Sequence, residues 1–251
     1  MRRGKSIEKE FVNHKTMETD NIMQSFLRQL ITHNNREWFK AHRDLYDAAW
    51  GEFTQLTARL IEAIAIFDPS VSYLTPKDCQ FRIYRDIRFS ADKTPYKGHF
   101  GTYINEKGKK SYYGGYYIQI EPRKVMVAGG VWWLPTKEMH ALRHAIVDQA
   151  ELFHGIIQDP ELQNRKPTLG LNYYKRIPNG YPKDFPYPEY LLPKDYTISF
   201  DLPDDVLQRP DAVQIIADYC QAMKPFNDFI TENIEINLEE MESMRDVVKF
   251  L

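Results

Sequence analysis

The segment 82–97 holds the residues whose types and spacing most strongly suggest chemistry. It contains five cations and two carboxylates within sixteen positions. The cations are Arg82, Arg85, Arg88, Lys93 and Lys97, and the carboxylates are Asp86 and Asp92. The planar fork of a guanidinium group suits carboxylate and phosphate, and lysine adds a compact point charge. The segment therefore indicates either a bound anion or an ion-pair network that belongs to the fold.

The backbone that carries the arginines decides between these two interpretations. A strand over 81–89 would place Asp86 between two arginines on one face, where it would neutralise them, because side chains alternate along a strand. A strand that ends at Tyr84 would instead let three guanidinium groups converge on one phosphate or polycarboxylate, with Tyr96 stacking on an attached ring. The competing hypothesis is a set of surface ion pairs, which contribute little stability when exposed. We favour the ligand site, because arginines rarely cluster in such numbers for the fold alone.

Arg36 marks a second candidate position, at the start of a helix. Asn34 or Asn35 can cap this helix, since a short amide accepts hydrogen bonds from free N–H groups of the first turn. The positive end of the helix dipole favours an anion beside Arg36. We interpret the neighbouring Trp38 and Phe39 as core anchors, because helical periodicity already explains them.

Signatures of other chemistry are weak. His140 and His144 are four residues apart, but the glutamate of a zinc-protease motif is missing between them, and we expect no metal site. The sequence has no GxSxG elbow, Walker loop or GxGxxG, and we expect no cofactor. Cys79 lies just before the arginine segment, where nearby cations could lower its thiol pKa. Asp86 and Asp92 suit anchors better than bases, because neighbouring arginines favour their charged form.

Helical periodicity and capping residues predict the elements that would position these side chains. A short helix is expected over 21–31 and a long one over 36–64. Thr136 can cap a third helix. A last helical region follows Asp211 and should kink or break at Pro225, because proline lacks the N–H that a helix interior needs.

The middle of the chain changes to β-rich, partly alternating runs. They predict strands over 81–89, 99–105, 112–121, 124–134 and 196–201. The connections between the first four are too short for parallel crossovers. The expected fold class is therefore α+β, with an antiparallel β-meander sheet packed against several helices. The pairs Gly114-Gly115 and Gly129-Gly130 indicate bulges or close approaches of backbone.

The same patterns predict how the chain is divided. We expect a flexible leader over residues 1–19 and a single α+β domain over residues 20–251, because no repeat or flexible linker interrupts the chain. The stretch 173–193 is rich in proline and tyrosine. It is either a lid over the basic segment or a rigid surface wrap.

Composition limits the class of protein and its partners. The chain is 43% hydrophobic, and no apolar run approaches the roughly 20 residues that span a bilayer, so we expect no membrane partner. Without a secretory signal, two cysteines that lack CxxC spacing are most simply free thiols in the cytoplasm. The net charge is −2, because eight Lys and Arg against three acids over 81–110 are offset by acidic stretches such as 228–246. This balance argues against nucleic acid as a partner.

Several motifs also resemble one protein family along most of the chain, from about residue 23 to 229. They lie at 35–39, at 82–97, at 115–117 with Gly129-Gly130, and at 175–181. On these residues the chain resembles the mainly bacterial family designated domain of unknown function 2461. The resemblance implies no particular activity, cofactor or catalytic residue.

Three hypotheses for function follow. The first is binding of an anionic small molecule, bearing phosphate or carboxylate, with enzymatic turnover left open. The residues expected to bind it are Arg82, Arg85, Arg88, Lys93, Tyr96, Lys97 and Arg36. The second is a nucleic-acid or protein-binding module that uses the basic, aromatic face of the sheet. The third is an arginine network that only holds the fold together.

Overall fold

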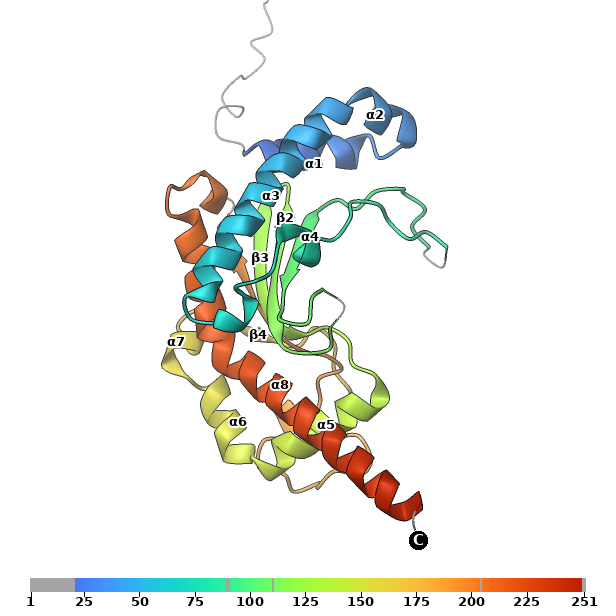
Figure 1. Cartoon of the computed structure of the whole chain (residues 1–251), viewed down its shortest axis with the longest axis vertical. Helices are drawn as coiled ribbons and strands as arrows, with labels where there is room; N and C mark the ends of the chain where they lie inside the picture. Colours follow the sequence, from blue (N-terminus) through green and yellow to red (C-terminus); the bar gives the residue numbers. More distant parts are fainter. Residues whose placement is uncertain (1–20, 89–90, 110, 204, 250–251) are drawn as a thin grey trace, which may run out of the picture.

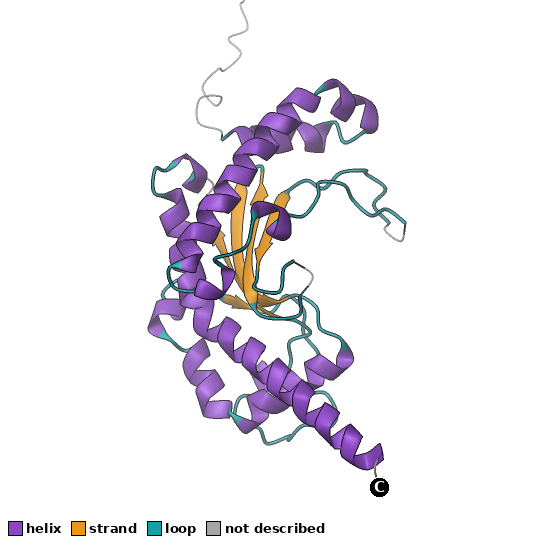
Figure 2. Ribbon diagram, in the orientation of Figure 1, coloured by secondary structure: helices purple, strands orange, loops and turns teal. Residues whose placement is uncertain are grey.

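The computed structural model describes residues 21–88, 91–109, 111–203 and 205–249, with side-chain surroundings described up to Ile234. Helices pack on an antiparallel sheet, which confirms the α+β class (Figure 1, Figure 2). The sheet has five strands in the order β1-β2-β3-β5-β4. The strands are β1 (Phe100–Ile104), β2 (Gly115–Glu121), β3 (Lys124–Val131), β4 (Thr168–Leu169) and β5 (Tyr196–Leu202).

The first three strands form the last three strands of the predicted four-stranded meander, and the other two come from farther along the chain. β1 pairs with β2, and β2 pairs with β3, in antiparallel register. β5, which was predicted over 196–201, pairs with the free edge of β3. The two-residue β4 pairs with the other edge of β5 and forms the edge of the sheet. A strand as short as β4 carries no periodic signal, and it was not predicted.

The strand predicted over 81–89 is wrong. Residues 80–88 and 91–99 instead form two irregular limbs, here called the arm, that leave the sheet before β1 (Figure 1). Its limbs are joined by an isolated bridge between Tyr84 and Tyr96. The Arg85 N–H donates to the Pro95 carbonyl at 2.9 Å, and the Lys97 N–H donates to the Ile83 carbonyl at 2.8 Å. The limbs pair mainly with each other, so the alternating sequence does not become a sheet strand.

The two faces of the sheet differ, and the difference follows from alternation along β2. Tyr116, Ile118 and Ile120 are buried on the face that packs against α3 and α8, whereas Tyr117, Gln119 and Glu121 are only half-buried on the other. Alternate side chains of a strand point to opposite faces, so one set enters the core and the next stays near solvent. The second face is therefore lined by polar groups next to the base of the arm.

The N-terminal helices begin at asparagine caps. Asn21 caps α1 (Ile22–Thr32), and Asn35 caps α2 (Arg36–Ala41) by accepting from the Trp38 N–H at 2.8 Å. The long helix predicted over 36–64 is divided at His42, where the backbone leaves helical geometry and α3 (Arg43–Ala65) begins. The apolar residues keep their helical spacing on both sides of His42, so the sequence pattern did not predict the break.

The remaining helices precede β1, connect the later strands or follow β5. They are η1 (Pro69–Val71), α4 (Pro76–Cys79), α5 (Thr136–Asp148), α6 (Ala150–Ile157), α7 (Pro160–Gln163), η2 (Pro188–Tyr190), η3 (Val206–Gln208) and α8 (Ala212–Lys249). α8 continues through Pro225, so a break there is wrong, while the alternative of a kink stays a prediction. None of the helices in the described ranges is long and apolar enough to cross a membrane.

The domain predictions have different outcomes. The leader predicted over 1–19 lies outside the described residues. The single domain over 20–251 stays a prediction, supported by buried apolar side chains that form one cluster from α1 to α8.

Candidate functional site

The arm is held against α2 by one aromatic side chain. The Tyr96 ring stacks on Phe39 with centroids 4.1 Å apart and an interplanar angle of 13°, and Tyr96 is 4% exposed. The Asn34 amide donates to the Tyr96 carbonyl at 3.0 Å and accepts from its N–H at 3.1 Å. Tyr96 was expected to bind ligand, but the structure places it as the anchor of the arm.

Two of the predicted cations are satisfied near the outer end of the arm. Arg88 donates from Nε and Nη2 to Asp86 at 3.0 and 2.6 Å. These hydrogen bonds hold the pKa of Asp86 down at about 2. Lys93 Nζ donates to the Ile87 carbonyl at 2.9 Å. Both cations therefore stabilise the local turn, as the structural hypothesis expected.

Three other basic side chains and a histidine gather near the base of the arm, and we call them the basic cluster. They are Arg82, Arg85, Lys97 and His99. Burial, followed by the charges of Arg82 and Arg85, lowers the pKa of the half-buried Lys97. Burial and then the charge of Lys97 lower the pKa of His99; Glu121 opposes them with a smaller raising effect, and Arg85 adds the smallest lowering effect. Positive groups are thus close enough to repel one another.

The basic cluster is only partly neutralised. Arg85 forms an ion pair with Asp92 through Nη1, while its Nε is buried without a hydrogen-bond partner. Arg82 is exposed and makes no ion pair or hydrogen bond with any residue in the described ranges. Lys97 Nζ lies 5.5 Å from the centroid of the Phe81 ring rather than beside a carboxylate. Three cations therefore share one directly paired carboxylate.

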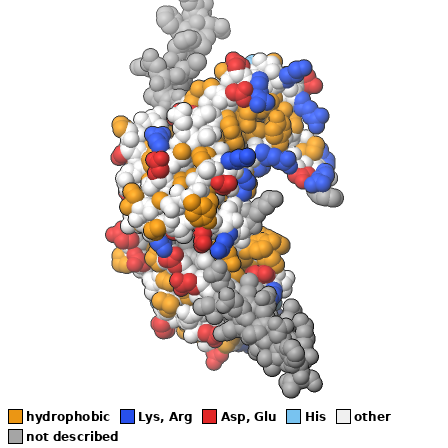
Figure 3. Space-filling view, in the orientation of Figure 1, with side chains coloured by type: hydrophobic (Ala, Val, Ile, Leu, Met, Phe, Trp, Pro, Cys, Tyr) orange, Lys and Arg blue, Asp and Glu red, His pale blue; other side chains and the backbone are white. Residues whose placement is uncertain are grey.

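The surface around the basic cluster could receive a ligand. Lys and Arg side chains gather along the arm, above a hollow in the molecular surface (Figure 3). Phe81 meets Tyr117 of β2 with ring centroids 6.4 Å apart. The Tyr117 hydroxyl donates to Gln119 Oε1 at 2.7 Å, which continues the polar face of the sheet. An anion at the arm would thus have a ring and polar groups beside it.

Arg36 lies on the anchored side of the arm. It is exposed in the first turn of α2, and its charge acts on the pKa of Tyr96 rather than on a group of the basic cluster. α2 has only six residues, and the structure gives its N-terminus no further ligand-binding group. The structure does not bring Arg36 together with Arg82, Arg85 and Lys97.

Cys79 does not have the activated thiol that its position suggested. Burial raises the pKa of Cys79 to about 12. The expectation of a lowered pKa is therefore wrong, because loss of water around the thiolate outweighs the distant cations. Cys79 and Cys220 are both buried and free.

The stretch 173–193 does not lie over the basic cluster. It connects β4 to the start of β5, whereas the arm enters the start of β1, at the other end of the antiparallel sheet (Figure 1). Tyr181 of this stretch packs on α5, with its hydroxyl 2.6 Å from His140 Nδ1 and its ring 5.1 Å from that of His144. The two histidines thus hold this stretch, and the geometry supports the surface wrap.

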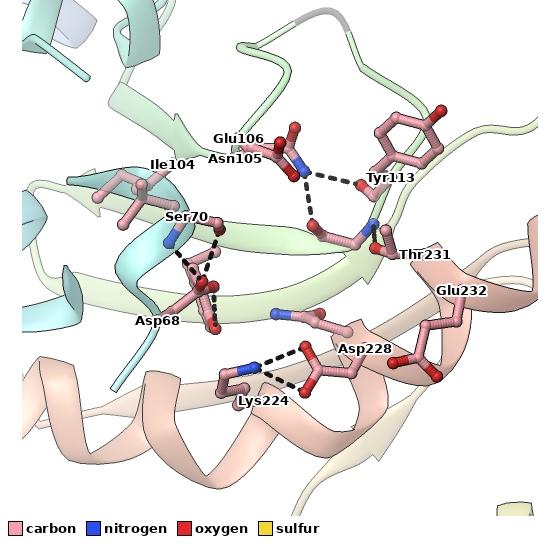
Figure 4. Close-up of a pocket in the computed structure, with 14 residues that line it drawn as sticks. Asp68, Ser70, Ile104, Asn105, Glu106, Tyr113, Lys224, Asp228, Thr231 and Glu232 are labelled. Atoms are coloured by element: carbon pink, nitrogen blue, oxygen red, sulfur yellow. Dashed lines mark hydrogen bonds and ion pairs between the residues drawn. The ribbon is translucent and has the colours of Figure 1, made fainter. Parts of the chain in front are cut away.

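A second site was missed by sequence reasoning. A cavity of about 210 Å³ lies between η1, the end of β1 and the middle of α8 (Figure 4). We call it the acidic cavity, because its charged lining residues are Asp68, Glu106, Lys224, Asp228 and Glu232. In the parts of the chain that the structure describes, no group of three or more His, Cys, Asp or Glu could hold a metal ion.

Close packing of α8 on the sheet builds the acidic cavity. A side chain at Gly114 would place its Cβ 2.5 Å from the Asn227 carbonyl oxygen, and one at Gly129 would come within 2.9 Å of Met223 Sδ. Both glycine pairs were predicted to mark bulges or close approaches, and this is a close approach. The spacing of Lys224, Asp228 and Glu232 along one helix face was the one sequence signal that could have indicated the cavity.

The residues that match a known protein family include those of both candidate sites. A family model described as "Conserved hypothetical protein (DUF2461)" matches residues 22–229. No curated protein and no solved structure matches the chain. The match includes the whole arm and every lining residue of the acidic cavity up to Asp228.

Proposed function

We propose that this chain, which belongs to the DUF2461 family of conserved hypothetical proteins, binds an anionic small molecule at the basic cluster. The ligand class is a phosphate- or carboxylate-bearing metabolite. Arg82 and Arg85 would supply guanidinium donors, and Lys97 a point charge. Tyr96 positions the arm and Lys93 adds positive potential from its outer end, where Asp86 neutralises Arg88.

The observation that carries this proposal is the environment of Lys97. Its ammonium group is half-buried, and two arginines lower its pKa further. Like charges that are brought together out of water destabilise the folded state unless a counter-charge joins them. A bound anion would supply that counter-charge and would engage the unpartnered Nε of Arg85.

The surroundings support a small molecule rather than a polymer. The strongly acidic stretch 228–246 and the net charge of −2 would oppose a nucleic-acid backbone. The half-buried Phe81 and Tyr117 offer an apolar wall for an attached ring. A cytoplasmic location is part of the proposal, and the two free buried thiols support it.

Titration calorimetry of the full chain with pyrophosphate and with citrate tests the proposal. At least one should bind, with an affinity that falls as salt is added. Arg82→Gln should weaken binding about tenfold, since it removes one charge-assisted donor. Arg59→Gln, which changes an exposed arginine on α3, is the matched control and should leave binding unchanged.

Two results would reject this proposal in favour of its competitors. Salt-sensitive binding of a labelled oligonucleotide, without binding of either small anion, would favour a nucleic-acid module. A lower Tm for Arg85→Ala, with no anion binding by the parent protein, would favour a purely structural network.

A further inference from the structure

The acidic cavity carries an excess of negative charge on its walls. Asp68 and Asp228 approach it from opposite sides, and Glu232 lies next to Asp228 (Figure 4). Lys224 is the one cation among the described lining residues, and its Nζ donates to both Asp228 oxygens at 2.8 and 2.7 Å. That ammonium group is therefore already engaged. Of the other acids in the lining, Glu106 pairs with Lys107 at 3.3 Å and Asp68 accepts from Ser70 and from the Tyr116 hydroxyl, while Glu232 has no partner among the described residues.

An unsatisfied donor is buried in the same wall. Asn227 lines the cavity and is 4% exposed, and its Nδ2 has no hydrogen-bond partner. Its Oδ1 accepts from the Gly130 N–H at 2.6 Å, which fixes the orientation of the amide. The side-chain amide of Asn227 lies near the Tyr116 hydroxyl, but the geometry is too poor for a hydrogen bond from Nδ2. The proton of that hydroxyl is donated to Asp68 at 2.9 Å. A buried donor without a partner is costly, so an acceptor from outside the chain is favoured here.

The arrangement suits an organic cation better than a metal ion. The carboxylates come from α8, from the N-cap of η1 and from the turn after β1, and they are spread around the walls. No described trio of acidic, histidine or cysteine side chains converges as metal coordination requires. A volume of about 210 Å³ corresponds to roughly seven waters at about 30 Å³ each, which is room for a single small molecule.

We propose that the acidic cavity binds a small molecule that carries both an ammonium group and a hydroxyl group, such as an amino alcohol or amino sugar. The ammonium group pairs with the carboxylates of Asp228, Glu232 and Asp68. The hydroxyl oxygen accepts from Asn227 Nδ2, and its proton can be donated to a neighbouring carboxylate. This site is separate from the basic cluster, with opposite charge and at the opposite end of β1.

Three matched probes test both halves of this recognition on the full chain by titration calorimetry. Glucosamine has the ammonium and hydroxyl groups, glucose lacks the ammonium group, and cyclohexylamine lacks the hydroxyl groups. Glucosamine should bind in the millimolar range or more tightly. Glucose and cyclohexylamine should each bind at least about fivefold more weakly, because each leaves one set of cavity groups unpaired.

Substitutions assign the binding to the cavity. Glu232→Gln should weaken glucosamine binding about fivefold, since an exposed carboxylate that makes no other described bond is removed. Glu62→Gln makes the same change at an exposed position of α3 and should have no effect. Asn227→Asp keeps the acceptor for the Gly130 N–H but removes the donor, so it should abolish the preference for glucosamine over cyclohexylamine.

The proposal is overturned if glucosamine does not bind, or if glucose binds as tightly as glucosamine. It is also overturned if Glu62→Gln weakens binding as much as Glu232→Gln. None of these outcomes depends on anion binding at the arm.

Discussion

Replacing Tyr96 with alanine should release the arm from α2. The Tyr96 ring is buried and stacked on Phe39 at 4.1 Å, and Tyr84 is a more distant neighbour of Phe39 at 6.1 Å. The two hydrogen bonds from Asn34 reach the backbone of residue 96, so alanine can retain them. The substitution therefore removes the ring contact while it leaves the backbone connection in place.

The size of the effect follows from this geometry. Deleting a buried aromatic ring from a core costs about 3–5 kcal/mol, of which favourable ring geometry supplies about 0.5–1.5 kcal/mol. Tyr96 packs beneath an arm rather than inside the sheet, so much of the loss should appear as local opening. We expect the free energy of arm opening to fall by about 1.5–3 kcal/mol, which raises the open population about 10- to 150-fold.

Hydrogen exchange measures that opening directly. The amides of Arg85 and Lys97 are bonded across the arm at 2.9 and 2.8 Å, and both should lose protection in Tyr96→Ala. The Ile118 amide in β2 should change less, because it belongs to the sheet. Tyr96→Phe keeps the ring and should behave as the parent. Unchanged arm protection in Tyr96→Ala, or equal loss in Tyr96→Phe, would refute the anchoring argument.

Three further predictions concern packing and charge. Gly114→Ala should lower the free energy of unfolding by about 1–3 kcal/mol, because its Cβ would lie 2.5 Å from the Asn227 carbonyl oxygen. Gly155→Ala, in α6 with no atom within 4 Å, should instead leave stability unchanged or raise it by up to about 1 kcal/mol in the same denaturant titration. Lys97→Met should raise the Tm at neutral pH, since it removes an ammonium group whose pKa is lowered by folding. That gain should shrink as the pH rises from the lowered pKa towards 10.5, because the folded parent releases the Lys97 proton first and the unfolded chain only near 10.5; a gain that persists above this range would contradict the charge argument. The carboxyl of Asp86 should stay ionised until the pH falls through about 2 in an NMR titration, and an ordinary midpoint near 3.8 would show that its pair with Arg88 is not formed.

Local sequence patterns predicted most of the sheet and the starts of α1 and α2. Thr136, which was predicted to cap its helix, is instead the first residue of α5, and Pro135 stands at the cap position. Alternation in 115–121 specifies a strand with one buried face, and the amides of Asn21 and Asn35 satisfy the first turns of their helices. The arm was not predicted, because apolar and polar residues also alternate over 81–89 and this alternation predicted a sheet strand. Alternation describes an extended backbone, whereas a sheet strand also needs neighbours, and those lie far away in the sequence.

The candidate sites show the same limit. The short-range pair of Arg88 with Asp86 could be foreseen from composition, because the partners are two residues apart. The acidic cavity could not be foreseen, since it joins segments near residues 68, 105 and 228 that meet only after α8 packs on the sheet. Periodicity identifies the faces of each element, but it does not say which polar faces will meet.

The contacts within the arm also favour one of the two hypotheses for the arginines, a ligand site or a structural network. Tyr96 and the two acids of the arm stabilise the fold, because Tyr96 packs on Phe39 while Asp86 and Asp92 each pair with one arginine. If structure alone required these cations, the described carboxylates would be expected to neutralise them all. Arg82 and Lys97 are instead left without a carboxylate partner in the described ranges, and Arg82 lies close enough to lower the pKa of Lys97. The paired residues thus rigidify an arm that presents the unpaired ones, and such preorganisation is what an anion site requires.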